Sequence, residues 1–206
     1  DVTAWSMPLM EGVTSRTCGQ VNLSDASRVS ADDPVRAITA SGAAYGYVVP
    51  WSDAGQARLV LAALEAGLSG KATVEEFTVQ GREYPRGSVV FPLSANDGDM
   101  ATTLNTLATE IGAEYVALQS SWVEEGPNYG SDKFVALSFP KVAMAWGEGT
   151  SATDAGAARY VLERELGIPV APIRVGTLSQ ADLGRYDVLI LPDAGWGFEG
   201  EFGAGG

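Results

Sequence analysis

Histidine is missing from all 206 residues, and this absence excludes more chemistry than any other feature of the composition. Without an imidazole, the chain can supply no histidine-ligated zinc, no serine–histidine or cysteine–histidine nucleophile pair and no histidine general base. There is a single cysteine, Cys18, so an internal disulfide is excluded as well. Carboxylates remain as the acid–base groups on which a hydrolase could be built.

Basic residues and long apolar runs are also scarce. The chain has 13 lysines and arginines against 26 acidic residues, which gives a formal net charge of −13. That charge repels phosphate backbones and anionic lipids, so we expect neither nucleic acid nor a membrane surface as a partner. No apolar run approaches the ~20 residues that span a bilayer. With 46% hydrophobic and 19% charged residues, the composition is that of a globular protein.

Residues 38–139 have the pattern of an α/β domain. We expect strands at 45–50, 74–79, 88–91 and 115–118, and two helices between them. The first helix follows Ser52 or Asp53, ends near Gly67 and has its apolar stripe at Ala57, Val60, Leu61, Leu64 and Leu68. The second begins at Asp97 or Asp99 and ends at Gly112. This order predicts helices packed on the faces of a mixed or parallel sheet.

The flanking segments differ from that domain. Residues 1–37 are predicted to be a lead-in segment that packs on a neighbouring domain, and residues 119–139 an irregular boundary. Residues 140–206 alternate strand and helix, which predicts the first half of a parallel α/β domain, with the last domain incomplete. Its helix is expected at 154–166, with a buried stripe at Ala158, Val161, Leu162 and Leu166.

The final expected strand, residues 187–191, is apolar at four consecutive positions, Val188 to Leu191, which is typical of an interior strand covered on both faces. As a last strand it would form an exposed apolar edge. We therefore expect the native molecule to supply a neighbour beyond residue 206, from the rest of the polypeptide; a homo-oligomer stays open.

A glycine-rich loop follows the strand expected at 142–146. Residues 147–152, GEGTSA, match the G-x-G-x-x-A pattern of dinucleotide-binding loops. Glu148 and Asp154, however, place negative charge where a phosphate would lie, and the next strand ends in Arg174 instead of an acidic ribose ligand. A plain strand-to-helix loop is therefore favoured over dinucleotide binding.

The same loop holds the chain's candidate ligand contacts, because side-chain and backbone donors gather there at a helix N-terminus. They are Glu148, Ser151, Thr153, Asp154 and Asp193. Trp146 and Trp196 fall at the same sheet edge, where they either contact a ligand or pack against a further part of the fold. No catalytic, cofactor-binding or metal-ligating residue is predicted.

The cysteine and the paired glutamates are interpreted as residues without a catalytic role. Cys18 lies in a loop-like segment with no visible base, so we interpret it as a bystander. Glu75 and Glu76 are expected on opposite faces of one strand and cannot then share a site. The pairs Glu124–Glu125 and Glu163/Glu165 are interpreted as solvated surface charge.

Five segments, in order, resemble the C-terminal region of large bacterial zinc carboxypeptidases of the M14 family. They are DVTAWSMPLMEGV at 1–13, YVVPW at 47–51, YPRGSVVFP at 84–92, TDAGAARYVLERELGIPVAPIR at 153–174 and YDVLILPD at 186–193. The resemblance covers most of the chain, and it is the order of the segments that is specific. The chain departs from the family's usual spelling at Ala155, Ala157 and Ala158, where that spelling has bulkier residues.

The resemblance implies a class I glutamine-amidotransferase-like, flavodoxin-like α/β region attached to a secreted or periplasmic peptidase. The family's zinc site and catalytic glutamate lie upstream of the DVTAW segment, so zinc is expected in the parent peptidase and no cofactor in this chain. The leading hypothesis is a non-catalytic accessory region, either a scaffold or a ligand-binding module. The alternatives are an independent small-molecule-binding α/β domain and, less favoured, a glutaminase or thiol hydrolase.

Overall fold

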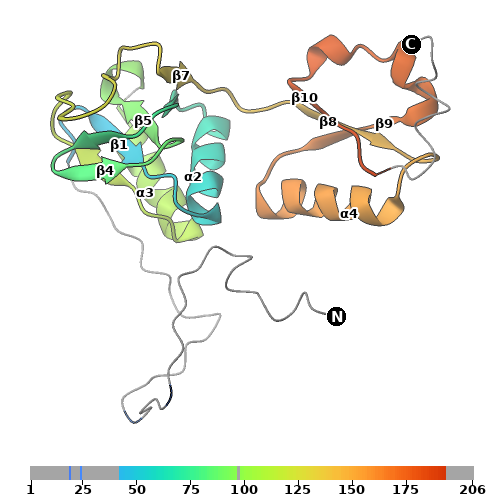
Figure 1. Cartoon of the computed structure of the whole chain (residues 1–206), viewed down its shortest axis with the longest axis horizontal. Helices are drawn as coiled ribbons and strands as arrows, with labels where there is room; N and C mark the ends of the chain where they lie inside the picture. Colours follow the sequence, from blue (N-terminus) through green and yellow to red (C-terminus); the bar gives the residue numbers. More distant parts are fainter. Residues whose placement is uncertain (1–18, 20–23, 25–41, 97, 194–206) are drawn as a thin grey trace. The chain divides into compact units, whose positions relative to one another are not determined.

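The computed structural model describes Gly19, Ser24 and residues 42–96 and 98–193. Most of the lead-in segment expected at 1–37, together with Cys18, Asp97 and Trp196, lies outside the described residues. The strands of the two larger sheets come from separate stretches of the chain (Figure 1), which we call the antiparallel domain (residues 42–136) and the parallel unit (residues 141–193).

The antiparallel domain is built on a five-stranded sheet of order β6-β1-β5-β2-β7. Its strands are β1 (Gly46–Val49), β2 (Lys71–Thr73), β5 (Val89–Pro92), β6 (Val116–Leu118) and β7 (Phe134–Ala136). All four strand pairs are antiparallel, with Tyr47 opposite Phe91 in the central pair β1–β5. Gly46 needs to be glycine here, because a Cβ would lie only 2.9 Å from the Pro92 Cα on the neighbouring strand.

The antiparallel pairing corrects the sequence-based expectation of a mixed or parallel sheet for this domain. Each helical crossover does join two strands that run the same way, β1 to β2 and β5 to β6. A third strand is inserted between the members of each pair: β5 separates β1 from β2, and β1 separates β5 from β6. This split arrangement makes every neighbouring pair antiparallel, and strand–helix order alone does not reveal it.

Helices α2 (Ala54–Glu65) and α3 (Met100–Ile111) pack together on one face of the sheet (Figure 1), as expected from their periodicity. The Asp53 carboxylate caps α2 by accepting from the Gly55 N–H at 2.7 Å, and Gly112 ends α3 with a φ of +77°. The helix at α2 is rotated from the predicted stripe. Its buried residues are Gln56, Leu59, Val60 and Ala63.

The other face of the sheet is covered by a hairpin and a loop that the sequence did not resolve. Only residues 77–79 of the expected strand 74–79 form a strand, β3 (Phe77–Val79), because residues 74–76 lie in a bend that follows β2. Strand β3 pairs with β4 (Arg82–Tyr84) through the Gln80–Gly81 turn. Both turn residues have positive φ, as a tight hairpin requires. Segment 119–139 is no simple boundary, because Val123, Tyr129 and Phe134 are buried against this face.

The parallel unit has a three-stranded sheet of order β10-β8-β9, with both pairs parallel. Its strands are β8 (Val142–Trp146), β9 (Val170–Arg174) and β10 (Val188–Ile190). Helix α4 (Ala152–Tyr160) continues into a π-helical turn, η3 (Val161–Glu165), and η4 (Val175–Gln180) is a 3₁₀ segment. The described residues thus form an α/β protein with a five-stranded antiparallel sheet, a three-stranded parallel sheet and the two-stranded β3–β4 hairpin.

Helix α4 and strand β10 differ from what the sequence predicts. Helix α4 begins after Ser151 instead of at Asp154, and Val161 of the predicted buried stripe is 48% exposed. Strand β10 lies at a sheet edge, with Val188 and Leu191 half exposed, so within the described residues it is not covered on both faces. Among those residues, no helix is both long and apolar enough to cross a membrane.

Candidate ligand crevice

A hollow of about 520 Å³ lies at the carboxyl edge of the parallel sheet, where β8 and β9 end. The residues that line it come from only two segments. They are Trp146, Gly147 and Glu148 after β8, and Arg174, Val175, Gly176 and Thr177 after β9. Open α/β sheets bind ligands outside the carboxyl ends of their strands, so the hollow occupies the position expected for a site. We call it the ligand crevice.

Register brings these two segments together. Trp146 and Arg174 are direct partners across the parallel β8–β9 pair, so both side chains leave the same face of the sheet. Trp146 is half-buried against the apolar cluster of β8 and β9, and the Arg159 guanidinium lies 5.6 Å from its ring centroid. Arg159 also pairs with Glu163 at 2.9 Å. These contacts hold the indole in place at the edge of the crevice.

Two opposite charges line the crevice. Arg174 and Glu148 are both exposed, and neither makes an ion pair with the other or with any other side chain among the described residues. The Arg174 carbonyl is engaged, because it accepts from the Thr177 hydroxyl at 3.0 Å. That bond closes the turn after β9 and does not involve the Arg174 guanidinium.

The glycine-rich loop is closed by its own hydrogen bonds. Thr150 donates to the Gly147 carbonyl through its backbone N–H at 3.1 Å and its hydroxyl at 2.8 Å. The Ser151 N–H donates to the Asp193 carbonyl at 2.6 Å, and the Asp154 N–H donates to the Ser151 hydroxyl at 3.3 Å. A phosphate-binding loop would point such N–H groups at its ligand. This bonding therefore favours the plain strand-to-helix loop.

The five predicted ligand contacts do not all meet at one place. Glu148 lines the crevice, whereas Ser151 caps α4 and joins the loop to Asp193. Thr153 and Asp154 are exposed in the first turn of α4 and do not line the hollow. The sequence reasoning missed Arg174 and Thr177 as site residues. The end of the neighbouring strand was the signal that could have found them.

A second hollow, of about 550 Å³, lies on the antiparallel domain beside the β3–β4 hairpin. Its charged lining is mostly acidic: Glu75, Glu76, Glu83, Glu125 and Arg86. The sequence argument that separated Glu75 from Glu76 is wrong, because these residues lie in a bend instead of a strand and both line the hollow. Glu125 joins them through a bridge to Thr78.

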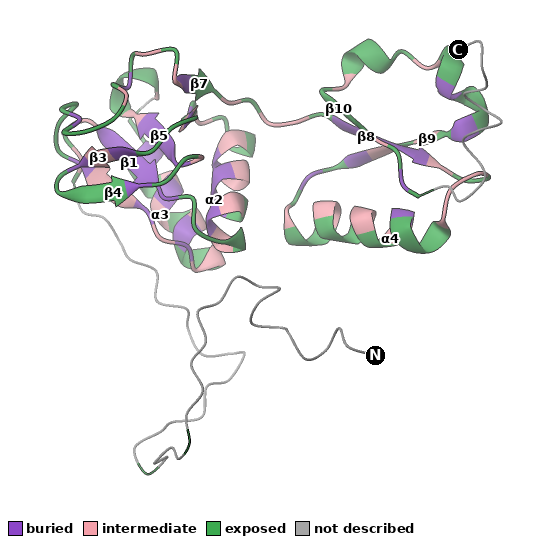
Figure 2. Cartoon of the chain, viewed as in Figure 1, coloured by how far each residue is buried: buried purple, intermediate pink, exposed green. Residues whose placement is uncertain are grey.

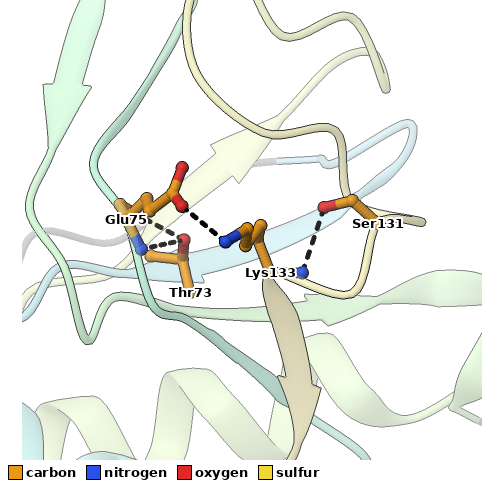
Figure 3. Close-up of polar contacts among 4 residues, drawn as sticks. All are labelled: Thr73, Glu75, Ser131 and Lys133. Carbon is orange, nitrogen blue, oxygen red and sulfur yellow. Dashed lines mark hydrogen bonds and ion pairs between the residues drawn. The ribbon is translucent and has the colours of Figure 1, made fainter.

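Local contacts account for part of this acidic surface. Figure 3 shows Lys133 reaching the Glu75 carboxylate, at 2.9 Å, while the Glu75 N–H donates to the Thr73 hydroxyl. The hydrogen bond and the charge of Glu75 raise the pKa of Lys133. Both side chains of the pair are about half exposed. Within the described ranges, no group of three acidic, cysteine or histidine side chains is placed to hold a metal ion.

Comparison with models of known protein families, with curated proteins and with solved structures finds no match. The geometry therefore defines only the class of protein. It is an α/β protein with an open crevice at the carboxyl edge of a parallel sheet.

Proposed function

We propose that this chain is a non-catalytic accessory region of an M14-type zinc carboxypeptidase and that its ligand crevice is a binding site. The family assignment rests on the five collinear segments between residues 1 and 193. The binding role rests on one observation: the ends of β8 and β9 enclose a hollow with charges of both signs at the edge where α/β sheets bind ligands.

The strand order supports the finer fold proposal. In sequence, β8, β9 and β10 are the first three strands of the parallel unit, and their spatial order, β9-β8-β10, is 2-1-3. A flavodoxin-like sheet begins with the same order before it continues with strands four and five. A flavodoxin-like, class I glutamine-amidotransferase-like unit is therefore our proposal for residues 140–206, and its further strands would come from the rest of the polypeptide.

Zinc chemistry is assigned to the parent protein alone. A chain without histidine cannot supply the His-x-x-Glu pair and later histidine of such a peptidase. In the parent, a zinc-activated water would hydrolyse a C-terminal peptide bond. A secreted or periplasmic location in a bacterium is part of the same proposal.

The reading frame upstream of Asp1 tests the assignment. We expect it to encode His-x-x-Glu and a later histidine, and its product to release C-terminal amino acids from peptides in a zinc-dependent manner. Arg174→Gln in that product should leave kcat for the peptidase unchanged, since the crevice does not take part in the chemistry. An upstream frame without the motif would overturn the assignment.

A second candidate function is an independent small-molecule-binding α/β domain, which the same crevice favours. The upstream sequence separates the two, because only the accessory role requires a peptidase. A glutaminase or thiol hydrolase is the third possibility, and it depends on Cys18, which lies outside the described residues. Loss of a measured hydrolase activity in Cys18→Ala would support that alternative.

A further inference from the structure

The charges of the ligand crevice point to the class of ligand. Arg174 and Glu148 line the same hollow but form no ion pair with each other, so the space between them is open to a third group. A simple anion would be attracted by Arg174 and repelled by Glu148, and a simple amine would meet the opposite pattern. A ligand that carries a carboxylate and an ammonium group would satisfy both side chains.

Size and wall chemistry restrict the ligand further. The hollow, about 520 Å³, falls within the range of small-molecule sites, roughly 300–1,000 Å³. The half-buried Trp146 supplies an aromatic wall beside Arg174, its register partner on the neighbouring strand. Indole surface favours apolar and aromatic groups. The ligand should therefore combine two opposite charges with an apolar side chain.

We propose that the ligand crevice binds a small α-amino acid zwitterion with an apolar or aromatic side chain. Arg174 holds the carboxylate, Glu148 holds the ammonium group and Trp146 contacts the side chain. Planar guanidinium matches carboxylate geometry, which favours this polarity of binding. The inference rests on the proposed function in one respect, because it requires that the crevice be a binding site.

Titration with L-phenylalanine, followed through the Trp146 indole N–H signal in the NMR spectrum, tests the proposal. A Trp146→Phe variant assigns that signal among the five tryptophans. N-acetyl-L-phenylalanine lacks the cation and L-phenylalaninamide lacks the anion, so both serve as matched probes. We expect saturable binding of L-phenylalanine in about the millimolar range, and at least ~10-fold weaker binding of each matched probe.

Two variants assign the charges. Arg174→Gln should weaken L-phenylalanine and N-acetyl-L-phenylalanine about 10-fold or more and leave the amide unchanged. Glu148→Gln should weaken L-phenylalanine and the amide and leave the N-acetyl compound unchanged. Arg164→Gln and Glu165→Gln, which remove exposed charges of η3 away from the crevice lining, are the controls and should change none of the three.

The outcomes separate the two levels of the proposal. N-acetyl-L-phenylalanine binding as tightly as L-phenylalanine would overturn the zwitterion and leave an anion site in the crevice. Equal binding of the amide would likewise make it a cation site. If none of the three compounds shifts the Trp146 signal up to tens of millimolar, the zwitterion proposal is wrong; the accessory role then depends on the upstream peptidase motif.

Discussion

The antiparallel domain and the parallel unit differ most in how much of their sheets is covered. The antiparallel sheet is packed on both faces, by α2 and α3 on one side and by the β3–β4 hairpin with the 119–134 loop on the other. In the parallel unit, the described apolar cluster has five buried residues, Val142, Met144, Ala155, Ile168 and Val170, and four further apolar residues, Ala143, Ala145, Val175 and Leu178, are buried outside it. Figure 2 shows buried colour on the central antiparallel strands and on β8, and exposed colour along much of α4.

This difference suggests different roles for the two regions: the antiparallel domain contributes most of the folding stability, and the parallel unit carries the binding site. The antiparallel sheet has an apolar cluster on each of its faces. The parallel unit instead keeps an apolar edge at β10 and an open crevice at the ends of β8 and β9. An exposed apolar edge strand is a pairing surface that soluble proteins normally protect. We therefore expect substitutions to act mainly on stability in the first region and on binding in the second.

Leu104→Ala should produce the largest loss of stability. Leu104 of α3 is fully buried between the helix and the antiparallel sheet, and truncating such a leucine costs about 3 kcal/mol of the free energy of unfolding. The matched control, Leu189→Ala in β10, removes the same atoms from a residue that is 36% exposed and should cost about 1.5 kcal/mol, half as much. Urea unfolding, followed through amide NMR signals of each region, measures both. Equal losses would remove the contrast between the two regions.

Alkaline pH should weaken the antiparallel domain before the parallel unit. Burial raises the pKa of Tyr84 and of Tyr129, so the folded domain keeps both phenols neutral when the unfolded chain already ionises near pH 10. Their contribution is fully present below that pH and is lost as pH rises through the raised values, by about 1.4 kcal/mol per pH unit for each tyrosine. Urea midpoints at pH 8, 10 and 11 measure the decline.

The parallel unit contains neither tyrosine and serves as the internal reference. Tyr129→Phe should reduce the alkaline slope of the antiparallel domain and leave the slope of the parallel unit unchanged. An unaltered slope in the variant would mean that Tyr129 does not titrate as argued.

Two tyrosines of the antiparallel domain should respond with opposite signs when the hydroxyl is removed. The Tyr129 hydroxyl is buried and has no hydrogen-bond partner within the described part of the chain, so Tyr129→Phe should stabilise the domain by about 1 kcal/mol. The Tyr115 hydroxyl donates to the Asn105 side chain at 3.3 Å, so Tyr115→Phe should destabilise it by about 1 kcal/mol. Thermal unfolding of the pair tests this, and a loss of stability in both variants would contradict it.

Sequence reasoning predicted elements better than it predicted how they pair. The 3.6-residue periodicity identified α2 and α3, and the apolar runs identified β1, β6 and β8, because these signals are local. The pairing of β1 with β5 at the centre of the sheet was missed, because pairing depends on residues far apart, such as Gly46 and Pro92. The hairpin at Gln80–Gly81 was missed: β3 was expected as the end of a longer strand, and β4, which is only three residues long, was not predicted.

The candidate site shows the same limit. The loop after β8 was predicted from a pattern within one segment, and it does contribute Glu148. Arg174 was noted only as a residue that speaks against a nucleotide, because its closeness to Trp146 follows from strand register and not from sequence distance. In parallel sheets, binding sites form between the ends of neighbouring strands. A motif within one segment therefore predicts only the residues that this segment contributes to the site.

Substitutions at the helix N-caps should have the smallest effects on the free energy of unfolding. Within the described residues, each region has one such cap formed by a side chain, so the two substitutions can be compared directly. The Asp53 carboxylate accepts from two backbone N–H groups at the start of α2, those of Gly55 and Gln56, whereas the Ser151 hydroxyl accepts only from Asp154 at the start of α4. Asp53→Ala should therefore cost about 1 kcal/mol and Ser151→Ala about 0.5 kcal/mol.

Urea unfolding followed region by region measures both substitutions, and Asp53→Asn and Ser151→Thr, which keep a capping oxygen, are the controls. Each control should recover most of the loss, because an amide or hydroxyl oxygen can still accept from the first turn. Ser151→Ala also keeps the backbone N–H that donates to the Asp193 carbonyl, so the loop beside the ligand crevice should hold its shape. A larger loss in Ser151→Ala than in Asp53→Ala would show that the crevice loop depends on this cap more than the antiparallel core depends on its own.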